Sequence, residues 1–179
     1  MPYPLVSTRS RPFAFMSDAV ALPPEQEVVE EAPVPTRRLL VFDLSNAQFA
    51  CDMDSFREIL PTPPMTRLPG APELVCGLIN LRGTIVTVLD GGLVLGRSAF
   101  RRAEGLVLII ESQERWVGMG VDDVRDIKDV PLDRFTMAGE HLVPVAGAVT
   151  GEVDIDGARV IVLDVKTVVQ QVIGHGGGR

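Results

Sequence analysis

The stretch Val75-Cys-Gly-Leu-Ile-Asn-Leu-Arg-Gly-Thr-Ile-Val-Thr-Val-Leu-Asp90 decides the fold of this chain. Its apolar residues form two runs, residues 75–79 and 84–89, which are typical of β-strands. Between the runs, Asn80-Leu-Arg-Gly83 has the composition of a tight turn, because glycine adopts backbone angles that other residues avoid. The stretch therefore predicts a β-hairpin with Arg82 at its tip.

This hairpin pattern occurs twice in the chain. Its second copy consists of Val145-x-Gly147-x-Val149, then Asp156-Gly157, then Val160-Ile-Val-Leu-Asp164, so that Gly77 and Gly147 are counterparts. An earlier segment is duplicated as well, because residues 40–49 and 53–59 resemble residues 107–116 and 121–127. Two copies of one strand-rich unit indicate a duplicated β-domain.

Short strands at regular spacing, joined by hairpins, predict small barrels. We predict an all-β fold of two five-stranded barrels that share a core, at roughly residues 37–100 and 101–173. The alignment of the copies places Trp116 opposite Phe49, which predicts that Trp116 lies in the core.

Both ends of the chain differ from this strand-rich region. Residues 1–36 are acidic and rich in proline, which predicts a disordered leader. Residues 165–173 carry apolar side chains at helical spacing after Asp164, which predicts a short closing helix. The glycine-rich residues 174–179 are predicted to be a flexible tail.

Charge and hydropathy exclude several classes of partner. The chain is 46% hydrophobic with a net charge of −7, and its sequence pI is about 4.8. Nucleic-acid binding requires a basic surface, so nucleic acid is not an expected partner. No apolar stretch approaches the ~18 residues of a membrane helix, so we expect no insertion into a membrane.

Few side chains in the sequence suit catalysis. The only histidines are His141 and His175, and no nucleotide-binding, zinc-protease or serine-hydrolase motif occurs. The two cysteines, Cys51 and Cys76, have neither metal-binding nor redox spacing and are predicted to be small buried hydrophobes. The paired acids, such as Asp122-Asp123, are predicted to be solvated turn residues. We therefore expect no enzyme, no cofactor and no metal, with a thiol hydrolase as the catalytic alternative.

Several motifs together carry a family resemblance. Residues 75–90, with Phe56-Arg-Glu58-Ile, Leu68-Pro-Gly-Ala-Pro72 and Leu163-Asp164, resemble the CheW-like domain of bacterial chemotaxis. That family carries the pattern Gly-x-x-Asn-Leu-Arg-Gly-x-x-x-x-Val-x-Asp, which residues 77–90 match. The resemblance covers about residues 37–173. It implies two SH3-like barrels around a shared core, without catalytic activity.

The resemblance also implies partners and a site. CheW-like adaptors join the cytoplasmic tips of chemoreceptors to the regulatory domain of the histidine kinase CheA, which implies a cytoplasmic location at receptor arrays. The family's matching glutamate faces its arginine, so Glu58 is expected to pair with Arg82. We predict that Arg82 and Glu58 shape a receptor-binding groove beside Asn80 and Leu81, while Gly77 and Gly83 serve the backbone. Asn80 is expected to bond its own turn.

One departure from the family leaves alternatives open. The family usually continues its Val-x-Asp motif with Leu-Arg, whereas this chain has Gly91-Gly92, which we expect to loosen the turn after Asp90. The chain could therefore be a divergent paralogue of a motility or developmental pathway that binds receptor without kinase. A third hypothesis, a small-barrel nucleic-acid binder, is disfavoured by the acidic pI.

Overall fold

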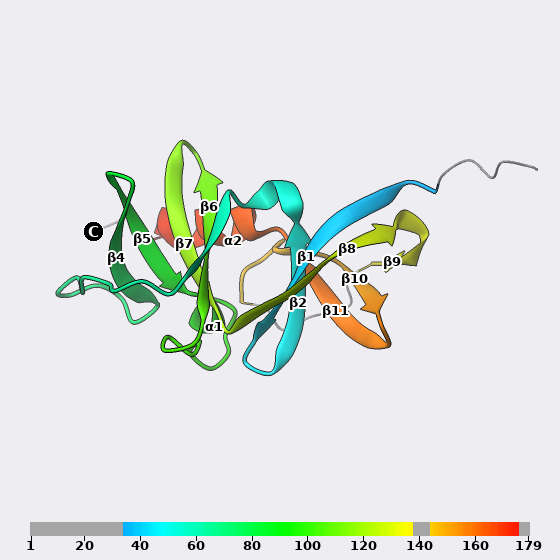
Figure 1. Ribbon diagram of the computed structural model, residues 1–179, viewed down its shortest axis with the longest axis horizontal. Helices are drawn as coiled ribbons and strands as arrows, with labels where there is room; N and C mark the ends of the chain where they lie inside the picture. Colours follow the sequence, from blue (N-terminus) through cyan, green and yellow to red (C-terminus); the bar gives the residue numbers. More distant parts are fainter. Residues whose placement is uncertain (1–33, 138–143, 176–179) are drawn as a thin grey trace, which may run out of the picture. The chain divides into compact units, whose positions relative to one another are not determined.

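The computed structural model describes residues 34–137 and 144–175 (Figure 1). The predicted leader lies outside the described residues up to residue 33, as do residues 176–179 of the predicted tail. The described chain forms these elements: β1 (Thr36–Leu44), β2 (Ala47–Asp52), η1 (Met53–Ser55), β3 (Glu58–Pro61), β4 (Val75–Leu81), β5 (Thr84–Asp90), α1 (Gly91–Val94), β6 (Leu106–Ser112), β7 (Arg115–Val121), β8 (Asp123–Pro131), η2 (Leu132–Arg134), β9 (Phe135–Thr136), β10 (Val149–Ile155), β11 (Ala158–Leu163) and α2 (Val165–His175). The strand-rich prediction and the closing helix are confirmed, and the helix runs two residues beyond the predicted end.

The strands form two sheets. Sheet A has the order β8-β1-β2-β11-β10-β9, and sheet B has the order β3-β6-β7-β5-β4. The segment after β3 returns to β4, where Thr66 and Leu78 exchange two backbone hydrogen bonds of 2.9 and 2.8 Å and so join the two edges of sheet B. In sheet A, β8 continues through η2 into β9, which connects that sheet's two edges. Sheet A has one strand more than predicted because the two-residue β9 pairs with β10.

The predicted lobe boundary near residue 100 does not separate the two sheets. Sheet A combines the first hairpin, β1 and β2, with the late strands β8 to β11, and sheet B combines β3 to β5 with β6 and β7. In Figure 1 the blue and cyan strands β1 and β2 therefore lie beside the orange strand β11. Two parallel strand pairs, β2 with β11 and β5 with β7, join the early strands of one copy to the strands of the other copy. The first hairpin of each copy, β1–β2 or β6–β7, thus belongs to the sheet formed by the remaining strands of the other copy.

Four hairpin turns join these strands in two matching sets. Ser45 and Asn46 have φ of 49° and 63°, and their counterparts Gln113 and Glu114 have 49° and 61°. Arg82 and Gly83 have φ of 50° and 88°, which Asp156 and Gly157 repeat at 53° and 81°. Two consecutive positive φ angles define the turn type whose twist matches that of antiparallel strands. The turns predicted at Asn80–Gly83 and at Asp156-Gly157 are therefore confirmed.

One buried cluster connects both sheets. Phe42 and Phe49 of sheet A are fully buried with Leu108 and Met119 of sheet B in a single contiguous core. A second, smaller cluster, which includes Leu39, lies on the other face of β1. Because β1 is buried on both faces, its sequence is a continuous apolar run rather than an alternating one. The prediction of a shared core is confirmed.

Close packing explains the two glycines after Asp90. Gly91 and Gly92 are buried in α1, which Asp90 caps by accepting a 3.1 Å hydrogen bond from the Leu93 amide. A Cβ on Gly92 would lie 1.9 Å from the carbonyl oxygen of Ser98, and one on Gly91 would lie 2.4 Å from that of Gly120. The expectation that these glycines loosen the turn is wrong, because they permit a tight approach of backbone to backbone.

Candidate partner-binding surface

The structure brings the predicted pair Glu58 and Arg82 together. Glu58 begins β3, where its partner strand is β6, and Arg82 lies at the tip of the β4–β5 hairpin. A terminal guanidinium nitrogen of Arg82 donates a 2.9 Å hydrogen bond to Glu58 Oε2. The Arg82 side chain is 75% exposed while that of Glu58 is 23% exposed. The Glu58 carboxylate therefore holds one terminal nitrogen of the Arg82 guanidinium, and the remaining N–H donors of the guanidinium face solvent.

The neighbouring predicted residues have different roles. Asn80 accepts a 2.8 Å hydrogen bond from the Gly83 amide, which confirms that its side chain serves its own turn. Leu81 is buried in the core, so its side chain does not line a surface. Gly77 has a φ of 149°, and a Cβ there would lie 2.7 Å from the Thr66 carbonyl oxygen. Gly77 thus permits the close approach that joins the edges of sheet B.

Sequence reasoning missed a second arginine at this surface. The Arg57 guanidinium forms an ion pair with Glu111 on β6 and lies 4.7 Å from the centre of the Trp116 ring. Trp116 is partly buried and packs against the core instead of lying inside it. The parallel pairs Thr87 with Val117 and Ile161 with Phe49 show that Phe49 corresponds to Val117. The sequence alignment was therefore one residue out of register, which reverses the face of a strand.

An apolar groove lies beside Trp116 on sheet B. It has a volume of about 920 Å³ and is lined by parts of β4, β5, β7, α2, the segment before β4 and the β6–β7 turn: Pro72, Leu74, Val75, Thr84, Ile85, Thr87, Leu89, Glu114, Arg115, Trp116, Val117, Val172 and Ile173. Ile85 is 63% exposed, so its apolar side chain faces solvent at this groove. We call this feature the apolar groove. A rimmed apolar hollow of this kind is typical of a surface that binds another protein.

Removal of the Arg82 side chain should leave the fold intact. An exposed ion pair contributes about 0–1 kcal/mol to stability, because solvent screens it and ordering the side chains costs entropy. Arg82→Ala is therefore expected to change the free energy of unfolding by less than about 1 kcal/mol, as measured by urea denaturation. A loss of several kcal/mol would instead assign Arg82 a structural role.

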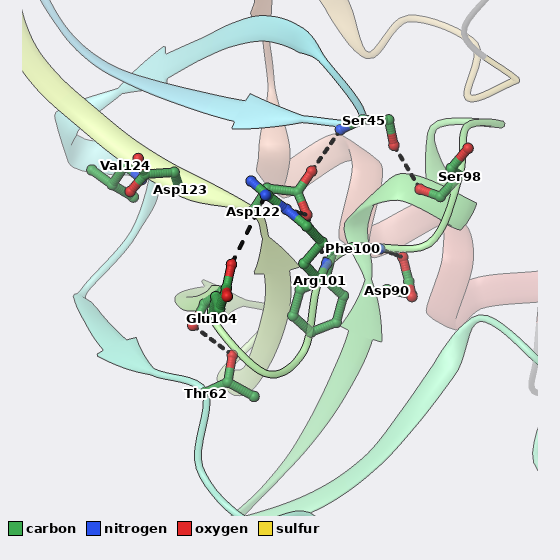
Figure 2. A network of polar contacts seen from close by, with 11 residues as sticks. Ser45, Thr62, Asp90, Ser98, Phe100, Arg101, Glu104, Asp122, Asp123 and Val124 are labelled. Carbon is green, nitrogen blue, oxygen red and sulfur yellow. Dashed lines mark hydrogen bonds and ion pairs between the residues drawn. The ribbon is translucent and has the colours of Figure 1, made fainter.

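A polar junction connects the first hairpin turn to the loop after α1 (Figure 2). Asp122 lies between β7 and β8, where the chain passes from sheet B to sheet A, and is only 8% exposed. Its carboxylate accepts 2.7 Å hydrogen bonds from the backbone amides of Ser45 and Arg101. Ser45 Oγ in turn donates to the Ser98 carbonyl oxygen at 2.6 Å. The prediction that Asp122 is a solvated turn acid is wrong, because Asp122 is buried and its carboxylate oxygens accept hydrogen bonds from two part-buried backbone amides.

Both thiols are buried, as predicted. Cys51 and Cys76 are 0% and 2% exposed. Burial raises the pKa of Cys51 from 9.0 to about 12, with a smaller contribution from the charge of Asp52. Burial also raises the pKa of Cys76 to about 11. Because only the thiolate is nucleophilic, neither side chain is prepared for reaction near neutral pH.

The raised pKa of Cys51 predicts a loss of stability in alkali. Above pH 9 the unfolded chain releases this proton while the folded protein keeps it until about pH 12, so rising pH favours unfolding in that range. We expect the stability difference between wild type and Cys51→Ala to be constant below pH 9 and to shrink above it. Urea midpoints of both proteins at pH 7, 8, 9 and 10 measure this, and a difference independent of pH would contradict it.

The described residues give no sign of a metal site or a membrane helix. Within residues 34–137 and 144–175, no group of three metal-ligating side chains is close enough to hold an ion. His141 lies outside the described residues. No helix in the described part of the chain is long and apolar enough to cross a membrane.

The comparisons with known proteins agree with the motif analysis. Residues 38–172 match the model of the CheW-like domain. A chemotaxis protein CheW of Rhizobium meliloti is 34% identical over 95 residues, which is 52% of this chain and 61% of that protein. Protein PilI of Pseudomonas aeruginosa is 30% identical over 132 residues, which is 73% of this chain and 69% of that protein.

A solved structure extends the agreement to the fold. The crystal structure of the scaffolding protein TtCheW from Thermoanaerobacter tengcongensis superposes with a TM-score of 0.64 at 23% identity, over 72% of this chain and 88% of that one. The fold is therefore that of TtCheW. With the family model matched over both copies of the repeat, this chain belongs to the CheW-like domain family.

Proposed function

We propose that this chain is a non-catalytic adaptor that couples chemoreceptor cytoplasmic tips to the regulatory domain of a CheA-type histidine kinase. Its membership of the CheW-like family supports a chemotaxis scaffold. The observation that carries the proposal is the exposed Arg82, held by Glu58 at the hairpin tip of sheet B. Such an adaptor would act in the cytoplasm at receptor arrays.

The geometry suits recognition of a helical receptor tip. A guanidinium fixed on one side presents its remaining donors to polar groups of a partner. The apolar groove on the same sheet offers Ile85 and Trp116 as contacts for large apolar side chains. An aromatic or aliphatic anchor with an arginine beside it is a common composition of the residues that dominate protein interfaces.

The chemistry of the described residues supports binding rather than catalysis. The thiols of Cys51 and Cys76 are buried and resist ionisation, which disfavours the thiol-hydrolase alternative. The net charge of −7 disfavours the nucleic-acid alternative, because phosphate binding requires a basic surface.

Capture of both partners by the full chain tests the proposal. We expect immobilised wild type to retain the organism's receptor-tip fragments and its CheA-type regulatory domain. Arg82→Glu should lose the receptor fragment, because the variant lacks the guanidinium donors that face the partner. It also places a second carboxylate against that of Glu58 at the surface. The double variant Glu58→Arg with Arg82→Glu, which restores an ion pair, separates the need for the pair from the need for arginine at position 82. Capture of neither partner by wild type would refute the adaptor.

The second candidate function is a divergent paralogue that binds receptor without kinase. The similarity to Protein PilI, which is 30% identical over 73% of this chain, supports a paralogue. The departure at Gly91-Gly92 motivated the same alternative, although both residues are buried. Retention of the receptor fragment without the kinase domain in the same experiment would select the paralogue.

A further inference from the structure

A second groove lies on sheet A at the position equivalent to the apolar groove. The apolar groove follows the parallel pair β5 and β7, and this one follows the parallel pair β2 and β11. It has a volume of about 660 Å³ and is lined by Asp43, Asn46, Ala47, Gln48, Arg101, Asp122, Arg125, Ala158, Arg159 and Ile161. The hairpin registers place Arg159 where the apolar groove has Ile85. We call this second feature the arginine groove.

Its three arginines are anchored in one common way. In each, the Nε atom points to a carboxylate: Arg125 to Asp43 at 2.8 Å, Arg159 to Glu152 at 3.5 Å and Arg101 to Asp122 at 3.8 Å. Figure 2 shows Arg101 between Asp122 and Glu104, whose carboxylate lies 3.9 Å from Nη1. Arg125 donates hydrogen bonds through Nε to both carboxylate oxygens of Asp43, and the longer Arg159 and Arg101 contacts are ion pairs through the same nitrogen.

Exposure separates the two signs of charge at this groove. The arginine side chains are 54 to 80% exposed, whereas the anchoring carboxylates of Asp43, Asp122 and Glu152 are 7 to 18% exposed. Among the charged side chains that line the groove, solvent therefore meets mainly guanidinium groups, although the exposed Glu104 carboxylate lies beside Arg101 and the whole chain carries a charge of −7. An approaching partner finds terminal N–H donors in the fork geometry that matches a carboxylate.

We propose that the arginine groove is a docking surface for an acidic protein segment with several carboxylates on one face. The charge complementarity is local, because the net negative charge of the chain disfavours long polyanions such as nucleic acid. A segment of a protein also brings backbone and amide donors for the carboxylates along the groove. The proposal goes beyond the adaptor function, which assigns no partner to this face. The two equivalent grooves thus have opposite chemistry and select different partners.

An NMR titration of the isotope-labelled full chain tests this inference. The probe is a synthetic helical peptide with glutamate at every fourth position, and its glutamine counterpart is the matched ligand control. We expect the glutamate peptide to shift the arginine Nε–Hε signals and the amides around Gln48 and Ile161. The effect should weaken as salt is added, because exposed charges are screened. The glutamine peptide should shift them little.

Variants locate the binding on the chain. Arg125→Gln with Arg159→Gln should weaken binding of the glutamate peptide by at least about fivefold, because two rim charges are lost. Arg38→Gln is the matched control, since Arg38 is also exposed on sheet A and paired with a carboxylate, Asp129, but lies outside the arginine groove. Unchanged thermal midpoints verify that all variants fold.

Three outcomes would overturn the inference. They are equal binding of the two peptides, equal weakening by Arg38→Gln, and tighter binding of a single-stranded DNA oligonucleotide than of the glutamate peptide. Each leaves the adaptor function standing, because receptor and kinase capture are measured separately on the same proteins. Conversely, failure of both captures with intact peptide binding would refute the adaptor alone.

Discussion

Gly92→Ala is expected to destabilise the protein by about 1–3 kcal/mol or more, because the added methyl group has no space. Its Cβ would lie 1.9 Å from the carbonyl oxygen of Ser98, which is backbone and cannot rotate away. Ser98 is also held by Ser45 Oγ at 2.6 Å, so displacing it would disturb the polar junction. At ~2–4 °C per kcal/mol for a chain of this size, a calorimetric scan measures the change readily.

Gly174→Ala is the matched control for Gly92→Ala. Gly174 also lies in a helix, α2, but a Cβ there would have no heavy atom within 4 Å. Alanine favours helix over glycine by up to ~1 kcal/mol, so this variant should be neutral or slightly more stable. Equal stability of Gly92→Ala and wild type would show that α1 does not pack against the following loop as described.

Asp122→Ala is expected to cost about 2–4 kcal/mol, because two part-buried amides lose a charged acceptor. The Asp122 carboxylate accepts hydrogen bonds from the amides of Ser45 and Arg101, which belong to segments far apart in the sequence. Their separation along the chain is the reason for a large effect, since no local turn can replace both bonds. Urea denaturation of the variant measures the cost.

The neighbouring acid supplies the control. Asp123 is exposed, and within the described part of the chain the one hydrogen bond of its carboxylate is accepted at 2.8 Å from the next amide along the chain, that of Val124. Asp123→Ala should therefore change stability by less than about 0.5 kcal/mol, as surface substitutions usually do. If both alanine variants lost the same stability, the effect would be one of general charge rather than of the junction.

Local features of the fold could be predicted from the sequence. Both turn sites, Arg82-Gly83 and Asp156-Gly157, were evident because each ends in a glycine, which tolerates positive φ. The pairing of Arg82 with Glu58 followed from the family motif and is confirmed. These predictions depend on neighbouring residues or on one motif, which a single sequence records.

The exchange of hairpins could not be predicted in the same way. Because the two copies have the same strand pattern, β1 and β2 complete either copy with equal local agreement. Only the parallel pairs β2 with β11 and β5 with β7 decide between them, and such long-range pairing leaves no periodic signal. The predicted lobe boundary near residue 100 therefore marks where the sequence repeat begins again, and it does not divide the strands into the two sheets.

The prediction of the site from the sequence was incomplete for two physical reasons. A one-residue slip in aligning the copies placed Trp116 in the core, because neighbouring residues of a strand face opposite sides. The arginine groove could not be predicted from the sequence, because its three arginines lie far apart in the chain. Arg101, Arg125 and Arg159 come together only where the exchanged strands pair. A register taken from the turns, which match Ser45-Asn46 with Gln113-Glu114, would have corrected the first error.

The most direct test of the adaptor function is sedimentation velocity of three purified components: this chain, a receptor-tip fragment and a CheA-type regulatory domain. The adaptor predicts a boundary faster than either binary mixture that contains all three proteins, and its loss when Arg82→Glu replaces wild type. Receptor fragment and kinase domain that displace each other from the chain, or that sediment independently of it, would contradict the bridging function.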